Sequence, residues 1–379
     1  MQYRPFGKTG YDVSLLGMGC MRFPRSDDGK IEREKAYEMV RYAVDNGINY
    51  FDTALGYPSS EEVLGEALDG ISRDKIKIAT KHPFWNSKLK DSLRRDLENS
   101  LKKLRTDYLD VYLIHCITKD SWPNIKQWEI LKEYKKFRDE GLIKAIAFSY
   151  HGEYETFAEI LKSYDWDMCQ VQHNFIDTDR EVTAKGIELA GEKGCAVVIM
   201  EPLLGGNLSN EPKIVSPIYG RARVQRSPVE WAFRYTANFP QASTILSGMT
   251  TLKELKQNIE LFSREDMTAG NLNDGDLAML AEVKAAYKSI VAISCTTCKY
   301  CTPCPQKVDI PGVFEAYNAA KMYEMTAQPR RVYSFLTKAK KDAGNCTECG
   351  ECEPKCPQNI RIIEGLKKSH ELLKGWVEL

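Results

Sequence analysis

Two short runs of cysteine near the C-terminal end constrain the fold of this chain more than any other feature. The first, CTTCKYCTPCP, covers residues 295–305, and the second, CTECGECEPKCP, covers residues 346–357. Eight crowded thiols in a chain of cytosolic character indicate a metal-binding domain rather than a set of disulfides. Four further cysteines are scattered over the first 290 residues, where we expect them to be small buried side chains: Cys20, Cys116, Cys169 and Cys195.

The spacing within the runs favours iron–sulfur clusters over zinc. Structural zinc commonly takes two separated C-x2-C pairs, whereas three evenly spaced cysteines and a remote fourth are typical of a [4Fe–4S] cluster. In two-cluster ferredoxins the fourth cysteine of each run ligates the other cluster. We therefore predict two [4Fe–4S] clusters, one held by Cys295, Cys298, Cys301 and Cys356, and one held by Cys346, Cys349, Cys352 and Cys304. The first run is one residue shorter before its last cysteine, so the partition there stays open.

The segments around the two runs read as helices. GVFEAYNAAKMYEMT (312–326) and RVYSFLTKAKKDAG (331–344) lie between them. KVDIPGVFEAY (307–317) and NIRIIEGLKKSHELL (359–373) follow the two Cys-Pro pairs as matching halves. We therefore expect residues 286–379 to form a small, mainly α-helical domain of the dicluster ferredoxin type.

Charge and hydropathy exclude several classes of protein. Lys plus Arg and Asp plus Glu each number 53, so the formal net charge is zero, and no nucleic-acid or membrane partner is expected. The N-terminal residues MQYRPFGKTG lack the apolar region of a secretory signal, and no run of 18 apolar residues occurs. These observations favour a cytoplasmic protein.

Residues 1–285 alternate short apolar runs with amphipathic helical stretches. Eight runs rich in β-branched residues read as buried strands: 13–20, 48–54, 76–81, 109–116, 143–150, 168–174, 196–202 and 243–249. Helical patterns between them cover 32–47, 92–105, 125–141, 227–238 and 251–262. Eight strand–helix units predict a (β/α)8 barrel, and the opening YRPFGKTGYDVS predicts a β-hairpin below it. A doubly wound open sheet is the alternative, but no G-x-G-x-x-G opens the first strand–helix turn.

Ionisable residues follow three successive strands at their carboxyl ends, where the active sites of such barrels lie. Asp52, Lys81 and His115 end the second, third and fourth predicted strands, and Tyr57 lies on the loop after the second. A phenol donates a proton at neutral pH, and a neighbouring ammonium would lower its pKa. A carboxylate would hold the ammonium, and an imidazole would orient a carbonyl oxygen. We therefore predict a catalytic group made of these four side chains.

Over residues 1 to about 265 the chain resembles the aldo-keto reductases. The resemblance rests on FDTALGY (51–57), IATK (78–81), LDVYLIH (109–115), QVQHN (170–174), EPLLGGNL (201–208) and STILSGMTTLKELKQNIE (243–260). It implies a (β/α)8 barrel that passes hydride between a nicotinamide cofactor and a carbonyl or alcohol, with the family's tetrad on Asp52, Tyr57, Lys81 and His115. Together with the cysteine runs, it resembles the subset of this family that carries a C-terminal 4Fe-4S domain.

The resemblance also implies a nicotinamide site. Its residues are Gly19, Met21, Ser149, Gln170, Met200, Leu203, Gly205 and Asn258. Tyr150 and Met200 stand where many members have Asn and a ring-stacking Tyr, and the loop 203–207 would lie over the pyrophosphate. Glu254 stands where many members use Arg to bind the 2′-phosphate of NADP, and a carboxylate repels that group. The cofactor is therefore NAD or NADP, with NADP preference in doubt, or the barrel uses no free nicotinamide at all.

Three functions remain open on the sequence. In the first, the clusters relay electrons between a ferredoxin-like partner and the barrel. In the second, a nicotinamide-dependent reductase uses its clusters only as structure. In the third, a non-enzymatic electron-transfer or docking module has kept a retired barrel, which the intact tetrad argues against. The sequence does not identify the carbonyl or alcohol substrate or the oligomeric state.

Overall fold

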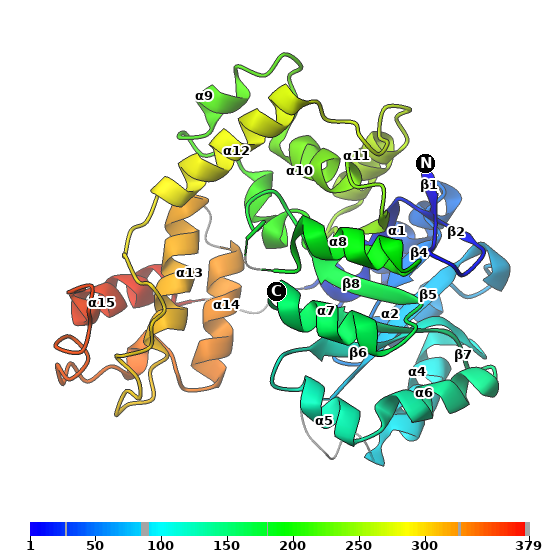
Figure 1. The fold of residues 1–379 in the computed structure, drawn as a ribbon, viewed down its shortest axis with the longest axis horizontal. Helices are drawn as coiled ribbons and strands as arrows, with labels where there is room; N and C mark the ends of the chain where they lie inside the picture. Colours follow the sequence, from blue (N-terminus) through cyan, green and yellow to red (C-terminus); the bar gives the residue numbers. More distant parts are fainter. Residues whose placement is uncertain (27–28, 85–90, 180, 325–326, 376–379) are drawn as a thin grey trace. The chain divides into compact units, whose positions relative to one another are not determined.

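The computed structural model describes residues 1–26, 29–84, 91–179, 181–324 and 327–375 (Figure 1). Its contacts divide the chain into two compact units. The barrel unit comprises Met1–Pro202 and Glu230–Asn273, and the C-terminal unit comprises Leu203–Val229 and Asp274–Leu379. The chain thus enters the C-terminal unit twice. The predicted domains, residues 1–285 and 286–379, are instead two continuous stretches of the chain, and this division stays a prediction.

All eight predicted strands form, and they close into a parallel barrel, which confirms the predicted fold. Their order round the barrel is β10-β3-β4-β5-β6-β7-β8-β9. The strands are β3 (Leu16–Gly19), β4 (Tyr50–Asp52), β5 (Lys77–Pro83), β6 (Leu109–Ile117), β7 (Ile143–Tyr150), β8 (Met168–Gln172), β9 (Ala196–Met200) and β10 (Ala242–Ser247). Inward side chains two residues apart, such as Val111 and Leu113 or Ala145 and Ala147, fill the interior with small and branched groups.

Amphipathic helices follow the strands and turn their apolar faces to the barrel. They are α1 (Arg33–Asp45), α2 (Ser60–Ala67), α4 (Leu93–Leu104), α5 (Trp122–Gln127), α6 (Ile130–Asp139), α7 (Tyr154–Ser163), α8 (Thr183–Glu192), α10 (Pro228–Ala237) and α11 (Leu252–Phe262), with short 3-10 turns η1 (Cys20–Arg22) and η2 (Arg73–Lys75). The helix predicted over 125–141 is interrupted because Glu129 takes a positive φ of 52°.

The predicted hairpin is present as β1 (Tyr3–Pro5) and β2 (Asp12–Ser14), paired antiparallel. Its apolar side plugs the amino ends of the strands, where Phe6 stacks on Tyr11 and lies 5.5 Å from the ring of Tyr50. Gly7 has a φ of 54°, and a Cβ there would lie 2.5 Å from the backbone nitrogen of Ala196. Only glycine allows this approach, so the opposite end of the barrel is left for the chemistry.

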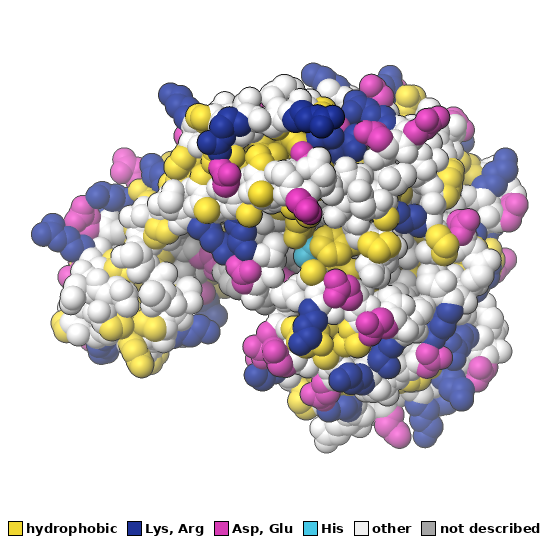
Figure 2. Space-filling model, turned by 45° about the horizontal axis from the view of Figure 1, so that its top comes forward, with side chains coloured by type: hydrophobic (Ala, Val, Ile, Leu, Met, Phe, Trp, Pro, Cys, Tyr) yellow, Lys and Arg dark blue, Asp and Glu magenta, His cyan; other side chains and the backbone are white. Residues whose placement is uncertain are grey.

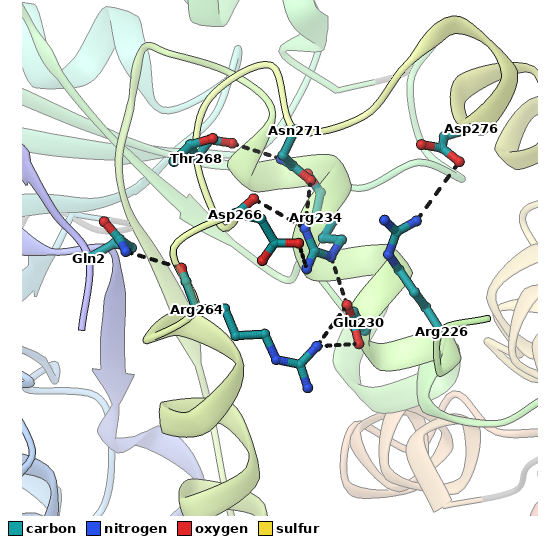
Figure 3. A network of polar contacts seen from close by, with 9 residues as sticks. All are labelled: Gln2, Arg226, Glu230, Arg234, Arg264, Asp266, Thr268, Asn271 and Asp276. Atoms are coloured by element: carbon teal, nitrogen blue, oxygen red, sulfur yellow. Dashed lines mark hydrogen bonds and ion pairs between the residues drawn. The ribbon is translucent and has the colours of Figure 1, made fainter. Parts of the chain in front are cut away.

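A polar network secures the return of the chain to the barrel (Figure 3). Arg234 on α10 donates to Glu230 at 2.8 Å and to Asp266 at 2.8 Å, with its side chain 2% exposed. Arg264 donates to both oxygens of Glu230 at 3.1 Å. In the C-terminal unit, Figure 3 also shows Arg226 facing Asp276 at 3.9 Å. Charged pairs therefore lie within each unit close to the points where the chain crosses between them, at residues 229–230 and 273–274.

The C-terminal unit is mainly helical, as predicted. It contains η3 (Leu204–Ser209), α9 (Ser216–Tyr219), α12 (Asp274–Ser289), α13 (Ile310–Met322), α14 (Ala327–Lys338), η4 (Ala343–Asn345) and α15 (Ile362–Leu373). α13 and α15 begin six residues after Cys304 and Cys356 and pack on each other. Their apolar faces form one core with Tyr333 and Ala343, and six half-buried cysteines pack against it.

The surface agrees with a balanced composition. On the face shown in Figure 2, Lys and Arg side chains are interspersed with Asp and Glu. Within the described residues no helix is both long and apolar enough to cross a membrane.

Candidate functional site

Asp52 and Lys81 form a buried ion pair at the carboxyl ends of adjacent strands. β4 pairs with β5 in a register that sets Asp52 opposite Ala79, so Lys81 lies just beyond the carboxylate. The Lys81 Nζ donates to Asp52 Oδ1 at 2.5 Å and to the carbonyl oxygen of Thr53 at 2.7 Å. The exposed fractions are 3% for Asp52 and 1% for Lys81. The ammonium is thus fixed from one side by two acceptors.

The rings of Tyr57 and His115 lie near that ammonium. The Lys81 Nζ is 5.3 Å from the centroid of the Tyr57 ring. The His115 ring approaches Tyr57 edge-on, with centroids 6.0 Å apart and planes at 84°. Both rings are half-buried. The structure therefore brings together all four residues of the predicted catalytic group.

Burial and charge set the protonation of the group. Burial alone would lower the pKa of Lys81, but the attraction of Asp52 outweighs it and raises that pKa. Burial, assisted by the Lys81 charge, lowers the pKa of His115 to about 3, so its imidazole is neutral. Burial raises the pKa of Tyr57 although Lys81 acts to lower it. We had expected the ammonium to leave this phenol more acidic than usual; the loss of water around the ring outweighs the charge.

Ser149, Gln170 and Met200 lie on three successive strands. Ser149 on β7 is in register with Gln170 on β8. The Gln170 Nε2 donates to the Met200 sulfur at 3.6 Å, and the Ser149 Oγ accepts from the Cys116 N–H at 2.7 Å. Gln170 is 3% exposed, and its buried Oε1 accepts no hydrogen bond from the described residues. An orphaned amide oxygen suits the NH2 of a nicotinamide carboxamide, so these residues fit the predicted cofactor.

Asn258, which is assigned to the adenine, and two further cofactor residues, Gly19 and Met21, lie near β3, β10 and α11. Asn258 on α11 is buried and donates to Ser247 Oγ on β10 at 3.2 Å. Gly19 ends β3, and a Cβ there would lie 3.3 Å from the carbonyl oxygen of Ser247. Met21 follows in η1 with its side chain 40% exposed.

Glu254 caps the N-terminus of α11. Its Oε2 accepts from the backbone N–H groups of Thr250 at 2.8 Å and Thr251 at 3.2 Å. Thr251 Oγ1 accepts in turn from the Glu254 N–H at 3.2 Å, which completes a capping box. A helix N-terminus is a natural anion site, and here the Glu254 carboxylate already occupies it by accepting these backbone hydrogen bonds. The T-x-x-E signature at 251–254 was readable in the sequence, but we had assigned Glu254 only a repulsive role.

Leu203 and Gly205 belong to the C-terminal unit and are not brought together with the other six cofactor residues within one unit. Gly205 has a φ of 68°, and a Cβ there would lie 2.9 Å from the Gln328 side chain. Nearby, Asn210 Nδ2 donates to the Tyr323 carbonyl oxygen at 3.1 Å. The glycines therefore shape a turn that packs against the helices of this unit.

The eight cysteines of the two runs line two neighbouring hollows, which we call the first and second cradle. The first cradle contains Cys295, Cys298, Cys301 and Cys356, with Ile310, Phe314 and Ile362 behind them. The second contains Cys304, Cys346, Cys349 and Cys352, and Cys301 and Ile310 also border it. The structure thus groups the cysteines as the cross-ligated partition does.

The donor set of the cradles fits iron–sulfur clusters. Six of the thiols are half-buried, whereas Cys298 and Cys349 are exposed. Burial raises the pKa of Cys352 to about 11 and also raises those of Cys295 and Cys301, so these thiols would lose their protons on binding a metal. Among the described residues, no three His, Cys, Asp or Glu side chains meet closely enough to hold a single ion.

Comparison with known families identifies both parts of the chain. The model of the aldo/keto reductase family matches residues 15–273, more than half of the chain. This chain belongs to the aldo/keto reductase family. It is therefore an oxidoreductase, and a 4Fe-4S dicluster domain matches residues 294–360 of the same chain.

Individual aldo-keto reductases are similar over the barrel. The soybean (Glycine max) protein named probable aldo-keto reductase 1 is 27% identical over 290 residues, covering 67% of this chain and 82% of the relative. The holo form of a Bacillus halodurans aldo-keto reductase superposes with a TM-score of 0.62 at 24% identity, covering 75% of this chain and 96% of that one. An aldo-keto reductase from Klebsiella pneumoniae, solved in complex with NADPH, gives a TM-score of 0.60 at 21% identity, with 75% and 96% covered. These likenesses to solved structures support the fold.

Proposed function

We propose that the barrel transfers hydride between a nicotinamide cofactor and the carbonyl or alcohol carbon of a small molecule, with Tyr57 as general acid and base. The observation that carries this proposal is the Lys81 ammonium, which is buried, held by Asp52 at 2.5 Å and placed 5.3 Å from the Tyr57 ring. Bound nicotinamide would supply or accept the hydride, and the residues of the chain would manage the proton.

Carbonyl reduction leaves an alkoxide oxygen that must take a proton. Tyr57 is protonated at neutral pH because burial raises its pKa, so the donor form is fully populated. Once the phenol releases its proton, the Lys81 ammonium stabilises the phenolate that remains. Neutral His115 would donate an N–H to the carbonyl oxygen and orient it toward Tyr57. In the reverse direction Tyr57 would accept the alcohol proton.

Ser149, Gln170 and Met200 would hold the nicotinamide, and Asn258 would hold the adenine end with Gly19 and Met21. Leu203 and Gly205 stay assigned to the pyrophosphate on the resemblance alone. The Klebsiella relative was solved with NADPH, but Glu254 here fills the helix N-terminus with negative charge. A 2′-phosphate would meet this carboxylate, so we propose NAD as the preferred cofactor.

We propose that the two cradles hold two [4Fe–4S] clusters, ligated by the two sets of cysteines given above. When bound, such clusters would supply single-electron transfer, by which electrons would pass between a ferredoxin-like partner and the barrel. The second candidate function is a reductase with structural clusters. It is favoured by the six cysteines that pack against the core of the C-terminal unit. We propose a cytoplasmic location for either function.

Replacement of Tyr57 by Phe tests the catalytic assignment. We expect kcat for carbonyl reduction to fall about 10²- to 10⁴-fold, because a positioned general acid contributes about that much, while NADH binding followed by fluorescence changes little. The substrate is the compound that the wild-type protein reduces fastest in a panel of small aldehydes and ketones. Tyr164→Phe, in a half-buried ring that stacks edge-on with Trp166 before β8, is the matched control. Unchanged turnover in Tyr57→Phe would refute the assignment.

A further inference from the structure

The two cradles present their exposed edges to solvent in chemically different ways. Cys298 and Cys349 are the exposed ligand candidates, one in each cradle. They occupy equivalent places in the two runs, where C-T-T-C-K-Y-C aligns with C-T-E-C-G-E-C. Lys299 and Tyr300 in the first run therefore correspond to Gly350 and Glu351 in the second. Because the two runs align, equivalent positions at the two edges can be compared directly.

The edge of the first cradle is basic and aromatic. Residues 296–300 are all exposed, and Tyr300 leaves 66% of its surface open, the highest value among the exposed large hydrophobic side chains of the described chain. Lys299 lines the first cradle, and no carboxylate lines it. Nor does any ion pair within the described residues involve Lys299. A cation and a large amphipathic ring thus stand free beside an exposed thiol.

The edge of the second cradle has the opposite charge. Glu348, Glu351 and Glu353 lie between its cysteines, against one cation, Lys355. Glu348 is paired with Lys367 at 2.7 Å, and Glu353 accepts from the Ile363 N–H at 3.0 Å. Two of the three carboxylates are thus engaged within the unit. This edge offers no exposed aromatic residue between its cysteines.

We propose that the edge formed by residues 296–300 is the docking site of a small acidic electron-carrier protein. The inference rests on the proposed clusters and extends them by naming the entry point and the charge of the partner. Tyrosine is enriched among residues that dominate binding energy, and charge complementarity steers encounter and fixes orientation. An acidic carrier fits Lys299 at the first edge and is repelled by Glu351, which takes the place of Tyr300 at the second edge. In this exchange the reduced carrier would be oxidised by one electron and the cluster proposed for the first cradle would be reduced by it, and no bond would be made or broken.

Binding of a plant-type [2Fe–2S] ferredoxin, a small acidic carrier, to the anaerobically purified full-length protein tests this docking site. Calorimetry gives Kd at low and high salt for the wild type, Tyr300→Ala, Lys299→Glu and the matched control Glu351→Ala. We expect Tyr300→Ala to raise Kd about tenfold or more and Lys299→Glu to weaken binding and reduce its salt dependence. Glu351→Ala should leave Kd within about twofold, as expected away from a hot spot. A carbodiimide cross-link should join Lys299 to a carboxylate of the ferredoxin.

The outcomes separate this inference from the proposed function. Iron content and visible absorption are measured for every variant, so each titration concerns a protein with its clusters in place. A colourless, iron-free wild-type preparation would contradict the proposed clusters. With full iron content, absence of ferredoxin binding, an unchanged Kd in both first-edge variants, or equal weakening by Glu351→Ala would overturn the docking site.

Discussion

Replacing one member of the buried Lys81–Asp52 pair should lower the unfolding free energy more than replacing both members. At an N–O distance of 2.5 Å, the attraction is about 7 kcal/mol for an effective dielectric constant of about 20. Taking two ions out of water costs several kcal/mol each, so the pair is close to neutral for stability. Lys81→Met leaves the Asp52 carboxylate buried without its cation. We expect this variant to lose about 3–5 kcal/mol of unfolding free energy.

The double variant Lys81→Met with Asp52→Asn removes both charges, and most of the lost stability should return. Urea unfolding followed by tryptophan fluorescence measures it, since five of the six tryptophans precede residue 232. Lys144→Met is the matched control, because that side chain is 52% exposed and lies 3.8 Å from Asp110. It should change stability by less than about 1 kcal/mol.

The pH dependence gives the same test a sign. In Lys81→Met the buried Asp52 carboxyl has a raised pKa, so the folded state binds more protons than the unfolded state. Stability lost by that variant should therefore grow as pH rises from about 4 to 8, through and above the usual carboxyl pKa. All variants at the pair should lose carbonyl reduction, since each disturbs the cation beside Tyr57. If Lys81→Met were as stable as the wild type, or if the single effects simply added in the double variant, the ionic account of the pair would be wrong.

Two further predictions concern pH and cofactor choice. The rate of carbonyl reduction at saturating substrate should show no inflection near pH 6.5, because burial lowers the pKa of His115 to about 3. The rate should fall only above the usual phenol range, because Tyr57 must be protonated to donate. The rate of alcohol oxidation should rise with pH over that range. A pH–kcat profile in both directions checks this, and a limb near 6.5 that His115→Gln abolishes would contradict it. Glu254→Gln should lower Kd for NADPH more than Kd for NADH, by about fivefold or more, because removing a carboxylate beside a phosphate is typically worth about 1 kcal/mol or more. Fluorescence titrations measure both constants, and Glu260→Gln on the same helix is the control. Equal effects on the two cofactors would argue against a 2′-phosphate at this place.

The positions of the barrel strands and of the four residues of the predicted catalytic group were predictable because both follow from local patterns. Buried parallel strands are continuous apolar runs, and their carboxyl ends must meet at one rim. Asp52, Lys81 and His115 are the ionisable residues that end three such runs, so their convergence follows from the order of strands alone. The grouping of the cysteines around the two cradles agrees with the spacing of the two runs, because in two-cluster ferredoxins the fourth cysteine of each run ligates the other cluster.

Features that depend on the surroundings of a side chain were not predictable in this way. The sign of the pKa shift at Tyr57 is the balance between burial and one charge, and a sequence does not report how much water remains around a ring. The packing of residues 203–229 with α12 and α14 depends on contacts such as Asn210 with Tyr323, more than 100 positions apart. Glu254 is different, because its capping box is local and could have been recognised.

The packing of the cysteines decides how the relay and the structural role can be separated. Because six of the eight thiols pack against the apolar core of the C-terminal unit, a variant that removes a cluster by replacing one of these six also removes part of that core. Loss of activity after cluster removal would therefore follow from either function and distinguish nothing. The two functions differ while the clusters are in place. A relay predicts that the intact protein, given NAD+ but no NADH, reduces its carbonyl substrate at the expense of two equivalents of a reduced one-electron donor and two protons, at a rate that Lys299→Glu lowers. A structural role predicts no product under those conditions, even though the same preparation turns over with NADH.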